Sequence, residues 1–321
     1  MNLIRCIMKR HVLWMVAICV AGTALYLHTL PYPFVCDDHH NILENPAVRM
    51  EQLAAGEVVD AGTGGIRSRP LAYITFAFNY WLSGYRPWSF RLVNIALHVA
   101  NGLLVYLFLL QTVRLASNRE VKPRSGRFSC LDVAGGTARE HALAGTAALI
   151  WLLHPIQIQA VVYIVQRMTG LATFFYLGAL CLYVSGRLAE RERVKWGCFG
   201  GCAVLWGLAM LSKEIAATLP FMLFLYEWLV FQKGSIPFLR RFAPLLLVPL
   251  LLVAGLAFAF WGMDPVGHIL SSYANQPFTV AERLLTEARI VVFYGSLLLY
   301  PAPHRFNLDH HFVVSSSFLA P

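Results

Sequence analysis

Two adjacent carboxylates, Asp37 and Asp38, follow the first long apolar run of the chain. Neighbouring carboxylates can divide acid–base chemistry, because one removes a proton while the other orients it or holds an acceptor. A solvated loop start, or an aspartate that caps a helix, accounts for the same two residues without chemistry. The pair therefore leaves two interpretations open, a general base and a local structural element.

Cations that interrupt apolar sequence form a second set, which contains Arg69, Arg167 and Lys213. A guanidinium matches a phosphate through two parallel charge-assisted hydrogen bonds. Charged side chains at membrane depth are costly, so Lys213 and the Glu214 that follows it are expected to pair or to face a polar cavity. The alternatives are an arginine that reaches lipid headgroups and an ion pair at the water boundary. Together these cations predict an anionic ligand.

Polar side chains at the ends of other apolar runs complete the candidate pocket, namely His39, His154, Tyr163 and Gln166. The proline after His154 is typical of a helix break. The histidine pair that begins at His39 and the sequence Asn-Leu-Asp-His-His at 307–311 would form a divalent-metal site if the two segments met, whereas surface polarity explains them without a metal. The seven cysteines lack metal-ligand spacing and are predicted to pack in apolar surroundings.

The composition indicates what kind of scaffold must position these residues. Of 321 residues, 58% are hydrophobic and 13% are charged, the mean hydropathy is +0.58 and the formal net charge is +9. This composition excludes a disordered, collagen-like or disulfide-rich secreted protein. The basic residues show no nucleic-acid-binding pattern and cluster between apolar runs, as in cytoplasmic loops of membrane proteins. An integral membrane protein is predicted.

Hydropathy and charge predict the path of the chain through the bilayer. The N-terminus and the basic loop Arg114–Arg139 are placed inside, and residues 31–90 form a first outer loop. Ile156–Arg167 is too short to cross alone and is predicted to be a half-helix or interfacial segment, and Ile290–Tyr300 a re-entrant segment or an eighth span. The predicted spans are Val12–Leu30, Leu92–Val113, Ala142–Leu153, Leu171–Ser185, Trp196–Leu211, Ile215–Phe231 and Phe242–Trp261.

A set of motifs in fixed order resembles one known family. The motifs are Phe-Val-Cys-Asp-Asp at 34–38, Ser-Arg-Pro-Leu at 68–71, Phe-Arg-Leu-Val-Asn-Ile-Ala-Leu-His at 90–98, His-Pro-Ile-Gln-Ile-Gln-Ala-Val at 154–161, Tyr-Ile-Val-Gln-Arg-Met at 163–168 and Leu-Ser-Lys-Glu at 211–214. They resemble the membrane portion of the tetratricopeptide-repeat O-mannosyltransferase-like proteins of the GT-C glycosyltransferase superfamily, bacterial type. The resemblance spans roughly residues 10–312.

The resemblance implies a fold and a reaction. The expected fold is an all-α polytopic membrane protein, a GT-C-like transmembrane helix bundle whose first outer loop contains short amphipathic helices. The expected reaction transfers a sugar from a polyprenyl-phosphate donor, with inversion, to a hydroxyl of a polypeptide or glycan, on the periplasmic face of the bacterial inner membrane. A divalent metal requirement stays open. The alternatives are a carrier of lipid-linked sugars and an inactive scaffold subunit.

The resemblance also assigns roles to residues. Asp37 or Asp38 would be the catalytic base, with Asp37 the first choice by position. Arg69, Arg167 and Lys213 would hold the donor phosphate, Glu214 would orient Lys213, and His154 would line the pocket. The family carries 34-residue helical repeats, and none is recognisable in this sequence. Residues 1–321 are therefore expected to form one membrane domain, which is either the N-terminal part of a longer protein or a truncated gene product.

Overall fold

The computed structural model describes residues 2–117 and 137–247, and beyond them residues 250–251, 254–255, 258, 262, 264–274, 276–306, 310 and 312–317. Every regular element in these residues is a helix, so the all-α prediction is confirmed. The chain divides into two compact units. The first comprises Met1–Leu153 and Gln157–Leu239, and the second comprises His154–Ile156 and Arg240–Pro321.

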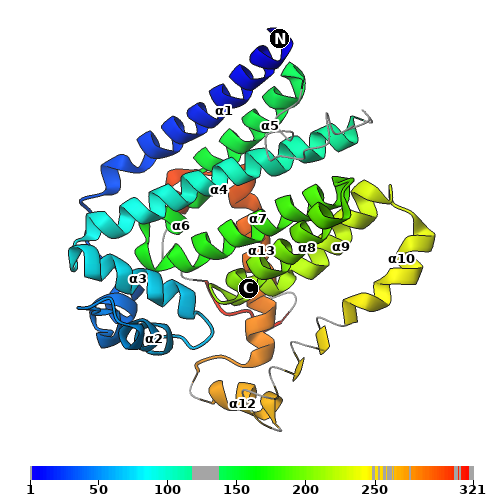
Figure 1. Cartoon of the computed structure of the whole chain (residues 1–321). Helices are drawn as coiled ribbons and strands as arrows, with labels where there is room; N and C mark the ends of the chain where they lie inside the picture. Colours follow the sequence, from blue (N-terminus) through cyan, green and yellow to red (C-terminus); the bar gives the residue numbers. More distant parts are fainter. Residues whose placement is uncertain are drawn as a thin grey trace. The chain divides into compact units, whose positions relative to one another are not determined.

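Long helices form the first unit: α1 (Asn2–Tyr26), α4 (Pro87–Ala116), α5 (Ala138–Leu153), α7 (Arg167–Leu188) and α8 (Glu192–Met210). Helix α4 packs against α1, α5 and α7, and α7 packs in turn along α8 (Figure 1). The close approach of α1 and α5 depends on a small residue, because a Cβ atom at Gly145 would lie 2.2 Å from the Trp14 ring. Ile18, Leu110 and Leu152 fill the space between these helices.

Among the described residues, four helices are long and apolar enough to cross a membrane, and a bent pair raises the number to five. The four are Lys9–Thr29, Pro87–Ala116, Ile164–Leu188 and Glu214–Phe231, and the pair is Ala138–Leu153 with Pro155–Val162, bent by 51°. These ranges agree with predicted spans and with the predicted break after His154.

Two predicted spans have a different outcome. Helix α8 covers all but the last residue of the predicted span Trp196–Leu211 but is not among the helices that are long and apolar enough to cross a membrane. Its first turns carry Glu192, Arg193 and Lys195, and this charge shortens its apolar part. Much of Phe242–Trp261, like most of the basic loop Arg114–Arg139, lies outside the described residues.

Short helices form the loop between α1 and α4, as predicted for residues 31–90. They are the irregular turns η2 (His39–Leu43) and η3 (Pro46–Val48), followed by α2 (Ala55–Thr63) and α3 (Pro70–Ser83). Helix α3 begins at a proline, whose fixed φ suits the first turn and whose missing N–H has no helical partner there. An apolar cluster that includes Phe34, Phe76 and Met168 packs this loop against the start of α7.

The second unit contains α12 (Pro265–Ser272) and α13 (Val280–Leu299). Thr279 and Glu282 form a capping box at the start of α13, each side chain bonding the backbone N–H of the other residue. The sequence predicted Ile290–Tyr300 to be a re-entrant segment or an eighth span, distinct from the amphipathic residues 282–289 before it. The structure joins the two in the single helix α13, since no residue between them breaks the helical hydrogen bonds.

Candidate functional site

A seven-residue junction, Tyr163–Thr169, holds together the motifs that the sequence analysis singled out. Helix α6 (Ile158–Val162) is followed by Tyr163, which has extended backbone angles, and the turn η6 (Ile164–Gln166) leads into α7. The junction contacts the loop that carries Asp37, the start of α3 and the segment that carries Lys213. Its changes of chain direction point backbone and side-chain groups toward all three.

The two adjacent carboxylates have different environments. Asp38 is fully buried, and its oxygens accept hydrogen bonds from the amides of Val35 at 3.1 Å and Val165 at 2.7 Å. Burial raises the pKa of Asp38, and these backbone bonds and the charge of Arg91 oppose that rise. Asp37 is exposed, and its amide donates to the hydroxyl oxygen of Tyr163 at 2.8 Å. Asp38 therefore anchors the loop, whereas Asp37 is exposed and lies next to the Tyr163 hydroxyl.

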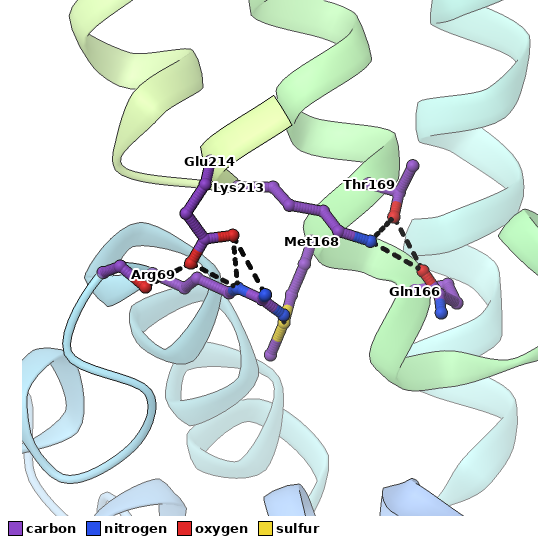
Figure 2. A network of polar contacts seen from close by, with 7 residues as sticks. Arg69, Gln166, Met168, Thr169, Lys213 and Glu214 are labelled. Carbon is purple, nitrogen blue, oxygen red and sulfur yellow. Dashed lines mark hydrogen bonds and ion pairs between the residues drawn. The ribbon is translucent and has the colours of Figure 1, made fainter. Parts of the chain in front are cut away.

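Arg69 and Glu214 form an ion pair next to the junction (Figure 2). The Arg69 Nη2 atom lies 2.9 Å from Oε2 of Glu214, and its Nε lies 3.1 Å from both carboxylate oxygens. The Ser68 hydroxyl donates to the same carboxylate, and Nη1 of Arg69 contacts the sulfur of Met168 at 3.5 Å. The Arg69 guanidinium thus binds one carboxylate through its Nε and Nη2 atoms.

The Lys213 side chain points away from the Glu214 side chain and reaches Gln166 and Thr169 of the junction (Figure 2). Its Nζ donates to Thr169 Oγ1 at 2.7 Å and lies 3.4 Å from Gln166 Oε1. Burial lowers the pKa of Lys213, and the nearby Arg69 charge lowers it further, while Glu214 acts against both. Sequence reasoning expected Glu214 to orient Lys213, but the Glu214 carboxylate bonds to Arg69 and Ser68, and the lysine is positioned by Thr169 and Gln166.

Arg167 does not lie with these two cations. Its side chain is buried, with 1% exposure, and donates to Asn94 Oδ1 at 2.9 Å and to the carbonyl oxygens of Thr75 at 3.1 Å and Phe90 at 2.9 Å. The guanidinium also lies 4.8 Å from the ring centroid of Phe76. In this position Arg167 joins α3, α4 and α7, and it offers no exposed face to a phosphate.

Arg91 is a positioning residue that sequence reasoning did not select. It is buried, with 1% exposure, and donates to the carbonyl oxygens of Val162, Tyr32 and Pro33. Arg91 thereby joins the segment that follows α1 to the end of α6, and its charge acts on the nearby Asp38 carboxylate. Its place in the Phe-Arg-Leu-Val-Asn motif, next to apolar residues, was the available signal.

The predicted pocket also includes two histidines. His39 is exposed in the loop after Asp38, and His154 belongs to the second unit, where its Nδ1 accepts from the Ile156 amide at 3.2 Å. Within the described part of the chain, no three His, Cys, Asp or Glu side chains gather as metal ligands would. Residues 307–309 and 311 of the suggested metal site lie outside the described residues.

The fold and the site together define a class, a multi-pass helical membrane protein with charged side chains gathered where helices break. The chain is similar to protein O-mannosyl-transferases. It is 29% identical to protein O-mannosyl-transferase Tmtc3 of Drosophila melanogaster over 243 residues, which is 70% of this chain and 25% of that protein. It is 28% identical to human TMTC2 over 272 residues, 80% of this chain and 29% of that protein.

A third relative, human protein O-mannosyl-transferase TMTC3, is 26% identical over 285 residues, 86% of this chain and 26% of that protein. The chain thus spans about a quarter of the length of the curated relatives it matches. No family model and no solved structure matches it. All three relatives are named as protein O-mannosyl-transferases.

Proposed function

We propose that the protein is a membrane glycosyltransferase that moves mannose or another hexose from a polyprenyl-phosphate donor to a Ser or Thr hydroxyl of an exported protein. The observation that carries this proposal is that the junction Tyr163–Thr169 contacts both Asp37 and Lys213. One segment positions an exposed carboxylate, Asp37, and a partly buried ammonium, Lys213. A base and a phosphate-binding cation are what an inverting transfer from a lipid phosphate requires. The similarity to proteins named protein O-mannosyl-transferases supports the same reaction.

In the proposed reaction, Asp37 accepts the proton of the acceptor hydroxyl. The hydroxyl oxygen attacks the anomeric carbon of the donor, and the bond from that carbon to the phosphate oxygen breaks with inversion. The electron pair leaves with the lipid phosphate, where Lys213 and Arg69 stabilise the developing negative charge. Asp38, which is bound by two backbone amides, holds the loop so that Asp37 keeps its position.

The sidedness of the site is part of the proposal. The loop with Asp37, the start of α3 and the segment with Lys213 all meet at the junction, so they share one end of the first unit. The basic N-terminal residues and the basic loop Arg114–Arg139 favour the opposite end for the cytoplasm. We therefore place the reaction on the periplasmic face of a bacterial inner membrane.

The test uses the full chain in lipid nanodiscs with a radiolabelled polyprenyl-phosphate mannose and a Ser/Thr-rich acceptor protein. Asp37→Asn is expected to lower transfer by about 10²–10⁴-fold, the usual contribution of a general base, and to leave donor binding unchanged. Glu44→Gln is the matched control, because Glu44 is an exposed carboxylate of the same loop whose ion-pair partner is His40. Donor binding without turnover in the wild type would favour the carrier, and absence of binding would favour the scaffold.

A further inference from the structure

A cavity of about 60 Å³, lined by both apolar and polar residues, lies between α4, the end of α5 and the start of α7. Its lining includes Asn94, His98, Asn101, Trp151, Arg167 and Thr169. A purely apolar cavity stays dry, whereas a buried polar group without a partner in a cavity wall favours an occupant that completes its hydrogen bonds. The lining therefore raises the question of what molecule this cavity takes.

Asn101 contributes an acceptor with an unmet bond. Its side chain is 3% exposed, and its Nδ2 donates to the Gly170 carbonyl at 3.0 Å. Its Oδ1 is buried and has no hydrogen-bond partner among the described residues. An amide oxygen left in this state in a helix interior costs about 1–3 kcal/mol.

Arg167 contributes donors to the same cavity. A guanidinium has five N–H groups, and the bonds of Arg167 to Asn94, Thr75 and Phe90 use one each from Nε, Nη1 and Nη2. Two N–H groups are left without a partner among the described residues. Two buried residues of the cavity lining, Asn101 and Arg167, thus carry an acceptor and two donors that have no partner among the described residues.

We propose that this cavity is an internal hydration site that takes water and excludes ions. An anion would satisfy the Arg167 donors but would be repelled by the Asn101 oxygen, and a cation would suit Asn101 but not Arg167. Water both donates and accepts, and each molecule needs at least about 10–15 Å³ of such space. The volume of about 60 Å³ therefore has room for more than one water. This site stands apart from the proposed transfer reaction.

The occupied cavity would bring solvent close to Lys213 from within the bundle. Thr169 lines the cavity, and its hydroxyl oxygen accepts from the Lys213 ammonium while its proton goes to Gln166 Oε1 at 2.7 Å. The water also keeps the charged Arg167 solvated inside helices that are apolar enough to cross a membrane.

Hydroxyl-radical footprinting of the full chain in nanodiscs tests the proposal, because X-ray pulses generate radicals from bound water and these oxidise the side chains beside it. His98 lines the cavity and is 4% exposed, and His141 is a matched control, buried at 0% exposure and bonded to Tyr106. Oxidation of His98 is expected to be severalfold faster than that of His141. Equal, slow oxidation of both histidines would overturn the proposal.

Asn101→Leu supplies the second arm. Leucine removes the acceptor and replaces it with apolar surface, so it is expected to lower the His98 oxidation rate severalfold and to leave the His141 rate unchanged. An unchanged His98 rate in a folded variant would overturn the proposal. The comparison of the two histidines in the wild type holds whether or not the variant folds.

Discussion

Two asparagines of α4 should differ sharply in what they contribute to stability. Asn94 and Asn101 lie two turns apart on the same helix, and each is 3% exposed. The Asn94 amide donates to the carbonyls of Val161 at 3.3 Å and Ile164 at 3.2 Å, and its oxygen accepts from Arg167. Asn101 donates one hydrogen bond. Leucine has a similar size, so Asn→Leu compares the bonds with little change of packing.

The expected magnitudes follow from the bonds that each substitution removes. At about 1 kcal/mol for a neutral hydrogen bond and about 2 for one to a charged group, Asn94→Leu would cost about 4 kcal/mol and Asn101→Leu about 1. Hydrogen bonds between membrane helices are weaker, about 0.6 kcal/mol on average, because the unfolded chain in lipid finds other partners. The expected losses then become about 2 and about 0.5 kcal/mol.

Equilibrium unfolding in mixed micelles, driven by added SDS and followed by tryptophan fluorescence, measures both losses. Retained helix content by circular dichroism would show that each variant inserts before unfolding is compared. Equal losses for the two variants, or a larger loss for Asn101→Leu, would refute the assignment of Arg167 to the bundle core. It would return Arg167 to the set of candidate ligand-binding residues.

Two further predictions concern the junction. Lys213 has a lowered pKa, so its ammonium loses its proton at a pH below the ordinary lysine pKa of 10.5. Donor binding should therefore decline as the pH rises and Lys213 loses its charge, whereas Lys213→Arg, whose guanidinium stays charged, should keep its binding. A decline of the same shape in Lys213→Arg would exclude Lys213 as the titrating group. Tyr163→Phe removes the hydroxyl that accepts from the Asp37 amide, so the rate of sugar transfer should fall by about tenfold, the equivalent of about 1.4 kcal/mol. Donor binding in a filter-binding assay should stay unchanged. Loss of donor binding would instead assign Tyr163 to the donor pocket.

The spans were the most predictable part of the fold, because hydropathy is a local property of sequence. The first span begins within a few residues of the predicted start, and the break at His154 follows from the proline after it. Helix α13 was harder, since its change from amphipathic to apolar pattern resembles a boundary. The capping box at Thr279 and Glu282 marks its true beginning.

The roles within the candidate site depended on contacts far apart in sequence. The sequence grouped Arg69 and Arg167 because both interrupt apolar runs, yet one pairs with Glu214 at the surface and the other lies in the core. Likewise, no property of the residues Asp37 and Asp38 distinguishes them. Their difference arises because the Val165 amide, 127 residues away, reaches one carboxylate.

The junction Tyr163–Thr169 also sets an order of assembly during synthesis. The chain emerges from its N-terminus, so the loop with Asp38 is translated 127 residues before the Val165 amide that anchors it. The Glu214 partner of Arg69 follows 145 residues after that arginine. We therefore expect the loop that carries Asp38 to remain undocked until α4 and α5 have been inserted. A nascent chain arrested before residue 163 would expose this loop to proteases, and one extended past residue 214 would protect it.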